Sequence, residues 1–358
     1  MPVSAIDAIS PAFQHTKQQL IQPFRAGQWA RLALVGLLAG ELHSGGCNGA
    51  SFQMPARTSG TEHFLGLPFP AINPALYAGL IAVVVVVGLV LLLLFIYVNS
   101  VMRFVLFDSV VAKRCEIRRG WNRRQTPGLR YFGWQLLLLG VFIMGLTILA
   151  GIPLGFAFAV GWLKDPSQHL VPLILGGMLL FFLLLAFVIA QFLVQVVSKD
   201  FVVPQMALED ISAFEGWRRL WPMLVAEKGG YAGYIGMKIV TAIGAAVVLG
   251  IVATIIILAL AIPLGGFGAI AVLLGKAAGL SWNLYTISVA VMAGTALVAL
   301  IVYAIALISV PAIVFFPAYS IYFFAPRYPA LYALLHPMPP PPAPPLAMGT
   351  VTGPEPIG

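Results

Sequence analysis

GLIAVVVVVGLVLLLLFIYV, residues 79–98, is an apolar stretch that carries no charge. About 20 consecutive apolar residues are enough for a helix to cross the hydrocarbon core of a bilayer. Four further stretches pass the same length test, at roughly 132–152, 171–197, 234–262 and 285–316. A sixth, from about residue 29 to 42, is short and contains Arg31 and Glu41. The sequence therefore predicts an all-α, polytopic integral membrane protein with about six transmembrane helices.

The composition excludes a soluble globular protein. Apolar residues make up 60% of the chain and charged residues only 9%, whereas soluble domains carry roughly 25% charged residues. The first 25 residues lack the basic start, apolar block and small-residue cleavage site of a cleavable signal. Residues 1–26 read instead as an amphipathic segment, with Ser10 before Pro11 as a helix start. We predict that this segment lies in the membrane interface.

Lysine and arginine are distributed unequally between the two sides of the predicted membrane domain. Segments 1–31, 103–130, 198–238 and the tail hold 3, 8, 5 and 1 of them, and the three intervening loops hold one each. Because such an excess marks cytoplasmic segments, six spans with both termini in the cytoplasm would place 17 of the 20 cations inside. We predict a multi-pass protein of the cell inner (plasma) membrane. Cys47 then lies outside and Cys115 inside, so both are expected to be free thiols.

Two short motifs recur along the chain in the same order. Gly120-Trp121-Asn122-Arg123 recurs as Gly216-Trp217-Arg218-Arg219, and Ile152-Pro153-Leu154-Gly155 recurs as Ile262-Pro263-Leu264-Gly265. Phe104–Asp108 likewise parallels Phe201–Gln205. The pattern predicts one membrane domain, 27–335, built from three parallel helical-hairpin repeats at about 27–111, 112–212 and 213–335. Each hairpin should turn at its outer Pro and Gly. Duplication of a stable hairpin explains such repeats without transport.

Two segments outside the predicted spans have distinctive compositions. The second repeat interval is longer than the first, which predicts a surface helix across 213–228 that ends at Gly229-Gly230. Residues 336–358 are dominated by proline, including Pro339-Pro340-Pro341-Pro342. Such a composition cannot form helix or sheet and predicts a disordered tail.

The basic segments indicate contact with lipid. Residues 103–130 hold eight cations and two anions, a net charge of +6, and each cation near an anionic leaflet contributes about 1 kcal/mol. The candidate headgroup contacts are Arg118, Arg119, Trp121, Arg123, Arg124, Trp217, Arg218 and Arg219. Tyr131, Trp134, Trp221, Tyr231 and Tyr234 complete a predicted aromatic girdle at headgroup depth. The predicted partners are the lipid bilayer and anionic lipids on the cytoplasmic side. A membrane-protein partner stays open, and no nucleic acid is expected.

The chain contains no motif for catalysis or cofactor binding. G-x-S-x-G, H-E-x-x-H, the P-loop and C-x-x-C are all absent, so we expect no enzyme, no cofactor and no metal. Glu41, His43, Cys47, Glu62 and His63 are zinc-ligating residue types at a spacing that matches no strong pattern, and their role stays open.

Within the spans, Asn99, Gln135, Gln191 and Gln195 form a candidate polar seam. Such residues serve either interhelical hydrogen bonds or a polar path. Lys238 is close enough to a helix start to snorkel to the surface.

Three motifs carry a resemblance to known proteins. Phe107-Asp108-Ser109-Val110, Ile117-Arg118-Arg119-Gly120-Trp121 and Tyr131-Phe132-Gly133-Trp134 resemble a broad group of uncharacterised prokaryotic multi-pass membrane proteins. That group is similar to the membrane domain attached to some glycerophosphodiester phosphodiesterases. The likeness covers most of residues 1–335 and leaves no room for the catalytic barrel of those enzymes.

The resemblance implies a membrane-embedded accessory or scaffold domain. We therefore expect a non-enzymatic integral membrane protein. A transporter or channel for a small solute is the alternative, and the scarcity of charge in the predicted spans weighs against it.

Overall fold

The computed structural model describes residues 4–41, 74–162, 166–279 and 283–336, and within these ranges the chain is helical without a strand. The helices are α1 (Ile9–Leu20), α2 (Ala26–Leu38), α3 (Pro74–Val111), α4 (Ile117–Leu146), α5 (Ile152–Ala159), α6 (Leu170–Val197), α7 (Val203–Glu209), α8 (Ala213–Ala226), α9 (Lys228–Ala277), α10 (Leu284–Phe324) and α11 (Pro329–Leu335). Two π-helical segments, η2 (Thr147–Gly151) and η4 (Ser198–Val202), join α4 to α5 and α6 to α7.

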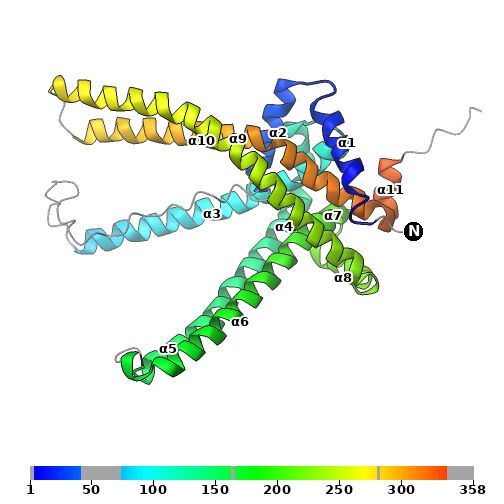
Figure 1. The fold of residues 1–358 in the computed structure, drawn as a ribbon, viewed down its shortest axis with the longest axis horizontal. Coiled ribbons are helices and arrows are strands. Elements are labelled where there is room, and N and C mark those ends of the chain that lie inside the picture. The colour runs from blue at the N-terminus through cyan, green and yellow to red at the C-terminus, as the bar shows by residue number, and fades with distance from the viewer. Residues whose placement is uncertain (1–3, 42–73, 163–165, 280–282, 337–358) are drawn as a thin grey trace, which may run out of the picture.

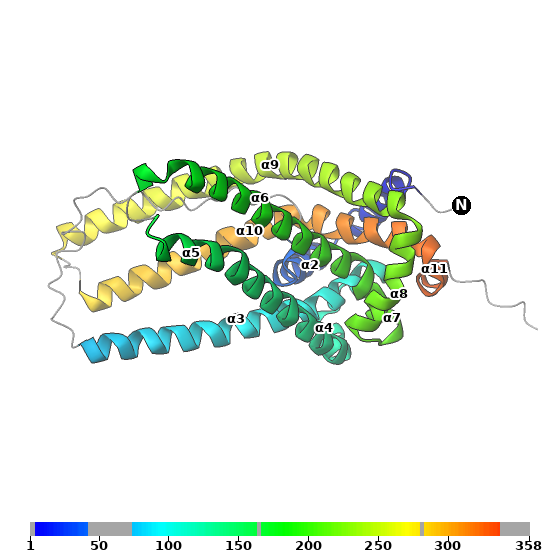
Figure 2. The same ribbon diagram turned by 90° about the horizontal axis from the view of Figure 1, so that it is seen from below.

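The helices form two regions that differ in packing. Three arms extend from one end of the molecule: α3 alone, α4 and α5 with α6, and α9 with α10 (Figure 1). At the other end the arm helices converge and are joined by α1, α2, α7, α8 and α11; we call this end the base. Figure 2 shows the arms running in one general direction away from it.

Five of the described helical segments are long and apolar enough to cross a membrane: 81–111, 117–159, 170–209, 228–277 and 285–327. α2 has 13 residues and is therefore about 20 Å long, less than the roughly 30 Å of the hydrocarbon core. The prediction of a polytopic all-helical membrane protein is confirmed at the level of five candidate spans.

The arms have almost no core of their own. Val83 to Val87, for example, are all half or more exposed along α3, and Val247, Ile251 and Ile255 are exposed along α9. A helix that is apolar on all sides does not need a partner helix when its surroundings are lipid tails. The arms are therefore surfaces for a bilayer.

The base contains a continuous apolar core. Phe104 of α3, Phe201 of η4 and Phe316 of α10 are fully or almost fully buried there. α1 and α2, the first two helices, pack against α10, the last long one. Trp29 donates from Nε1 to the Leu307 carbonyl at 2.8 Å, and Tyr319 donates to the Ala5 carbonyl at 3.0 Å. The two ends of the sequence thus meet in the base.

α1 confirms the predicted amphipathic helix. Its buried side carries His15 and Gln19, which contact the Val110 and Ser109 carbonyls at the end of α3 at 2.9 Å each. The last turn of a helix leaves its carbonyl acceptors without partners inside the helix. The Val110 carbonyl also accepts from the backbone N–H of Lys113 at 3.2 Å. α1 therefore caps α3. Its opposite side exposes Phe13.

The predicted ends of two membrane helices, at about residues 152 and 262 in the two Ile-Pro-Leu-Gly motifs, are wrong. α5 continues past Pro153 to Ala159, and α9 continues past Pro263 to Ala277. The π-helical segment η2 directly precedes the first motif and changes the hydrogen-bond register before Pro153, which has no N–H to donate. Among lipid tails a broken helix would leave backbone groups unsatisfied, so continuation is favoured.

The predicted surface helix at 213–228 is confirmed as α8, with one correction. α8 ends at Ala226, and the chain changes direction at Glu227 rather than at Gly229-Gly230, which belong to α9. The start is fixed by Ser212, whose side chain accepts a hydrogen bond from the backbone N–H of Glu215. The tail after His336 lies outside the described residues.

Candidate functional site

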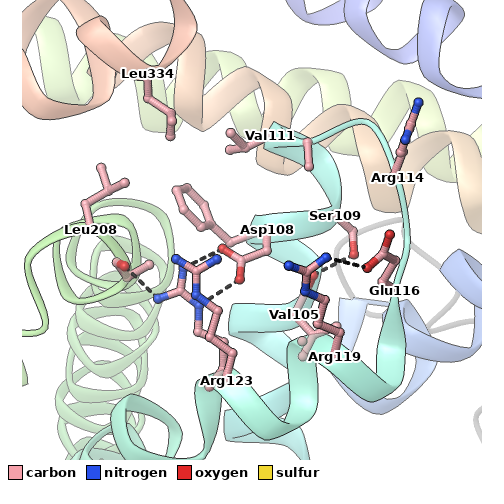
Figure 3. Close-up of a pocket in the computed structure, with 15 residues that line it drawn as sticks. Val105, Asp108, Ser109, Val111, Arg114, Glu116, Arg119, Arg123, Leu208 and Leu334 are labelled. Carbon is pink, nitrogen blue, oxygen red and sulfur yellow. Dashed lines mark hydrogen bonds and ion pairs between the residues drawn. The ribbon is translucent and has the colours of Figure 1, made fainter.

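A groove opens in the base where α3 ends and α4 begins (Figure 3). Its volume is about 460 Å³, and α7 and α11 contribute Leu208 and Leu334 to its wall. The connection between α3 and α4 is short, and Lys113 adopts a left-handed conformation with φ of 53° within it. This tight turn brings the basic start of α4 back against the end of α3. We call the site the arginine groove.

One ion pair forms a fixed wall of the arginine groove. Arg124 binds both carboxylate oxygens of Asp108, through Nε and Nη2 at 2.7 Å each, and its Nη1 donates to the Ala207 carbonyl at 2.6 Å. The Arg124 side chain is only 11% exposed. A bidentate arginine–carboxylate pair is both strong and directional. It ties α4 to α3 and to α7, so its guanidinium is already occupied.

The remaining cations of the groove are available. Arg119 lies 3.6 Å from Glu116, but its side chain is 85% exposed, so this contact contributes little. Arg114 and Arg123 have no hydrogen bond or ion pair to any part of the chain that the structure describes. With Asp108 and Glu116 as its acids and four arginines, the groove carries a net charge of +2. Its apolar wall includes Val105 and Val111.

A second hollow adjoins the groove at the N-terminus of α4. It has a volume of about 430 Å³ and is lined by Arg31, Glu116, Ile117, Arg118 and Arg119. The Glu116 side chain does not cap the helix. The first N–H groups of a helix, together with its dipole, favour an anion. The two hollows form one basic surface with the chemistry of a phosphate-binding site.

The second polar site is a buried ion network at the centre of the base. Lys199 pairs with Glu41, and Lys238 pairs with Asp200. Tyr234 donates to Asp200 at 3.0 Å. Asp200 is 3% exposed and Glu41 1% exposed, and an unpaired charge at such positions would be strongly unfavourable. Lys199 and Asp200 are neighbours in the π-helical segment η4, and each forms an ion pair with a residue outside it.

Arg103 extends the network toward α2 and α4. Its Nη1 donates to Tyr131 Oη at 2.9 Å, and its Nη2 lies 3.3 Å from the Ala39 carbonyl. This network was not predicted from the sequence, and the prediction that Lys238 snorkels is wrong. Lys238 is held inward by Asp200 because its part of α9 is packed in the base. Lys199-Asp200 directly after a long apolar stretch was the available signal.

Three of the predicted girdle tyrosines do not face lipid. Tyr131, Tyr231 and Tyr234 are 0%, 2% and 0% exposed. Tyr131 and Tyr234 are buried because their hydroxyls serve Arg103 and Asp200. The two motif tryptophans are half-buried: Trp121 packs edge-on against Tyr97 at 6.1 Å between ring centroids, and the indoles of Trp217 and Trp134 donate to Ser198 Oγ at 3.0 and 3.1 Å.

The predicted headgroup contacts fall into two groups. Arg118, Arg119, Arg123 and Arg124 lie together along the arginine groove and its neighbour. Arg218 and Arg219 lie on α8 and pair there with Glu215, and Arg219 also pairs with Glu209. The first group lines the two hollows described above.

The candidate polar seam is divided between helix pairs. Asn99 donates to the Leu38 carbonyl of α2 at 3.1 Å, and Gln191 donates to the Leu138 carbonyl of α4 at 2.8 Å. Gln135 is half-buried and Gln195 is exposed. Asn99 and Gln191 thus make the interhelical hydrogen bonds expected of them.

The zinc-type residues are largely untested, because His43, Cys47, Glu62 and His63 lie outside the described residues. Within the described ranges no three His, Cys, Asp or Glu side chains form a group that could hold a metal ion. Cys115 is a free, buried thiol, and burial raises its pKa. A thiol in this state is a poor nucleophile at neutral pH.

Comparison with known proteins gives one match. Residues 3–334 match the model of a family of unknown function, DUF7544. No curated protein and no solved structure matches the chain, so the resemblance to the membrane domain of some phosphodiesterases stays a prediction. Since the match covers nearly the whole of its length, the chain belongs to the DUF7544 family of unknown function.

Proposed function

We propose that this protein is a non-enzymatic membrane scaffold whose base binds anionic lipid headgroups at the cytoplasmic face of the plasma membrane. The arginine groove carries the proposal: it has a net charge of +2, cations without partners among the described residues, and an apolar wall. An amphiphile with a phosphate group fits this combination. The phosphate would contact the free guanidinium groups, and the first part of an acyl chain would contact Val111 and Leu334.

The direction of the described helices is compatible with the proposed six-span topology, in which both termini lie on the side of the base. α3, α6 and α10 run toward the base, and α4 and α9 run away from it (Figure 1). Glu41 lies in the base, whereas α3 begins at the far end of its arm. α1, near the N-terminus, and α11, near the C-terminus, both lie in the base. With 17 of the 20 cations on the side of the base in this topology, the base is the cytoplasmic end.

Equivalent contacts at the starts of the second and third repeats support the proposed duplication. A Cβ added to Gly120 would lie 3.2 Å from Val105, and one added to Gly216 would lie 2.7 Å from Val202. The two valines occupy the same place in the parallel motifs Phe104–Asp108 and Phe201–Gln205. Each motif glycine thus lets its helix approach the end of the preceding membrane helix. α2, at the start of the first repeat, packs on α10.

The proposal is tested by lipid binding to the purified protein in neutral detergent. We expect phosphatidate or phosphatidylglycerol to bind more tightly than phosphatidylcholine. Replacing Arg114 and Arg123 by Gln should weaken the binding of anionic lipids by about 2 kcal/mol, which is a roughly 30-fold higher Kd. High salt should reduce the preference.

A matched control removes the same charge elsewhere on the base. Lys17 and Arg25 are exposed and do not line the groove, so their replacement by Gln should change lipid affinity much less. Equal binding of anionic and neutral lipids by the wild-type protein would contradict the proposal. Equal losses in both double variants would show that only net charge matters.

The buried ion network favours transport of a small solute as the second candidate. Ionisable residues within membrane helices are functional by default, and Lys199, Asp200 and Lys238 lie within candidate spans. Proteoliposomes that contain ion-sensitive or pH-sensitive dyes test this reading. Flux that requires the protein and is lost in Asp200→Asn would favour a transporter. Absence of flux under an imposed gradient would favour the scaffold.

A further inference from the structure

A small void lies where the three arms meet in the base. Its volume is about 30 Å³, and it is lined from α3, from η4 with α7, and from α10. A space of this size holds one or two particles as large as a water molecule. Its lining includes the apolar residues Leu106, Val203 and Ile321. Four charged residues of the ion network also line it: Arg103, Lys199, Glu41 and Asp200. The void is therefore small and is bounded by apolar side chains, by two cations and by two carboxylates.

The ion network beside the void has an excess of positive charge. Among the described residues, Arg103, Lys199 and Lys238 face the two carboxylates of Glu41 and Asp200. An uncompensated charge is strongly disfavoured in a buried site. Arginine does not lose its proton in proteins, so the excess calls for a counter-ion or for proton loss from a lysine.

Hydrogen-bond donors remain available next to the void. Arg103 Nε is buried and has no hydrogen-bond partner, although Nη1 and Nη2 are engaged by Tyr131 and Ala39. Lys199 makes one hydrogen bond, to Glu41, within the described part of the chain, and an ammonium group has three donors. Unused buried donors without an acceptor are costly.

We propose that this void binds one small monoatomic anion of the chloride type. The anion accepts from Arg103 Nε and from Lys199, balances the excess charge of the network and contacts the apolar wall formed by the three arms. Polyatomic anions such as sulfate and gluconate are too large for the space. This site is separate from the arginine groove and does not depend on lipid binding.

The first test compares halides with larger anions on the full-length protein in neutral detergent. Thermal unfolding is measured in sodium chloride, bromide, gluconate and sulfate at matched ionic strength and pH. We expect the unfolding midpoint to be a few degrees higher in chloride and bromide than in gluconate and sulfate. Crystals grown in bromide should show an anomalous peak beside Arg103 Nε. Equal midpoints in all four salts and no bromide peak at that position would overturn the proposal and leave water in the void.

Variants connect the halide effect to the void. Arg103→Gln should abolish the difference between chloride and gluconate. Arg327→Gln removes another buried arginine, one that binds Glu227 at 2.7 Å through Nε and Nη2, and should lower the midpoint equally in both salts. If Arg103→Gln does not fold, Val203→Leu serves instead, because the added methylene fills the void and leaves every charge in place. A halide effect that survives Val203→Leu would exclude this site.

Discussion

The base and the arms have similar helices and opposite environments. In the base, side chains such as Phe104 and Tyr234 are completely enclosed by protein. In the arms, leucines, valines and phenylalanines of the same helices are more than half exposed, as Val84 of α3 and Phe181 of α6 illustrate. A single helix changes character along its length: α3 is exposed from Ile81 to Leu92 and buried from Val101 to Val110.

The difference shows which forces hold each region. Lipid tails are as apolar as leucine, so burial against another helix gives the arms no hydrophobic gain. The base adds ion pairs, tyrosine hydroxyls and tryptophan indoles that require partners. A substitution in the base should therefore cost far more than the same kind of substitution in an arm.

The largest contrast is expected at the buried ion pair of Asp200 and Lys238. Asp200→Ala leaves the Lys238 ammonium buried without its carboxylate and should destabilise the protein by about 3–5 kcal/mol. Lys276→Ala, which removes an exposed cation near the end of α9, should change stability by less than about 0.5 kcal/mol. Denaturant unfolding in neutral detergent measures both.

A double variant separates the charge from the packing. Asp200→Leu with Lys238→Leu removes both charges and should recover most of the lost stability, because apolar replacements of a buried pair are often neutral. A single variant Asp200→Ala that unfolds like the wild type would show that the ion pair does not hold the base.

The next effect is expected at Ser198, which accepts from the indoles of Trp134 and Trp217. Ser198→Ala leaves two half-buried N–H groups without their acceptor and should cost about 2 kcal/mol. Thr254→Val is the control in an arm, because the Thr254 hydroxyl donates only to the Gly250 carbonyl of its own helix. Thermal unfolding and tryptophan fluorescence report the change. Equal midpoints for the two variants would remove the contrast.

Two glycine substitutions should differ in sign. Gly216→Ala places a Cβ 2.7 Å from Val202, and the overpacking should outweigh the gain in helix propensity, for a net loss of about 1 kcal/mol. Gly244 of α9 has no neighbouring atom within 4 Å of such a Cβ, so Gly244→Ala should gain about 1 kcal/mol. Shifts of the unfolding midpoint in the same direction for both variants, relative to the wild type, would argue against a close contact at Gly216.

The smallest effect concerns pH and is confined to α1. Burial lowers the pKa of His15 below its ordinary 6.5, and the nearby Lys113 lowers it further. The detached helix therefore binds a proton more readily than the packed one. The contribution of His15 to the packing of α1 on the base is complete above pH 6.5, the pKa of the detached helix. It is lost as the pH falls from there through the lower pKa of the packed state.

Hydrogen exchange at pH 7.5 and pH 5 measures the detachment of α1. Protection factors, which are corrected for the intrinsic exchange rate, are compared at the two pH values. We expect lower protection of α1 at pH 5 than at pH 7.5, no comparable change in α3, and no such change in His15→Gln. The ring contacts the Tyr322 hydroxyl at 3.1 Å and the Val110 carbonyl, and glutamine can keep only part of these contacts. An α1 that is equally protected at both pH values would contradict the account.

The arms could be predicted from sequence because their signal is local. Twenty apolar residues in a row determine a membrane helix whatever surrounds it. The ion network could not be predicted in this way, because its partners are far apart in the sequence. Lys199 is 158 positions from Glu41, and Lys238 is 38 positions from Asp200. Only the packing of α2, η4 and α9 brings these groups together.

The arginine groove lies between these cases. Arg119 and Arg123 are four residues apart, so one face of α4 was bound to be basic. The pair of Arg124 with Asp108 depends on the tight turn at Lys113, and it decides which cations remain free. The predicted helix ends before Pro153 and Pro263 are wrong. Proline usually ends a helix in water, whereas a membrane helix continues because lipid cannot hydrogen-bond to a broken backbone.

The contact of α2 with α10 has a consequence for biosynthesis. Trp29 and its acceptor Leu307 are 278 residues apart, and at about 5–20 residues per second their synthesis is separated by tens of seconds. During that time α1 and α2 have left the ribosome, but the helix on which they dock does not yet exist. The arms can enter the bilayer one after another, whereas the base closes only when the last long helix has been made. Assembly of this protein therefore ends at its N-terminus.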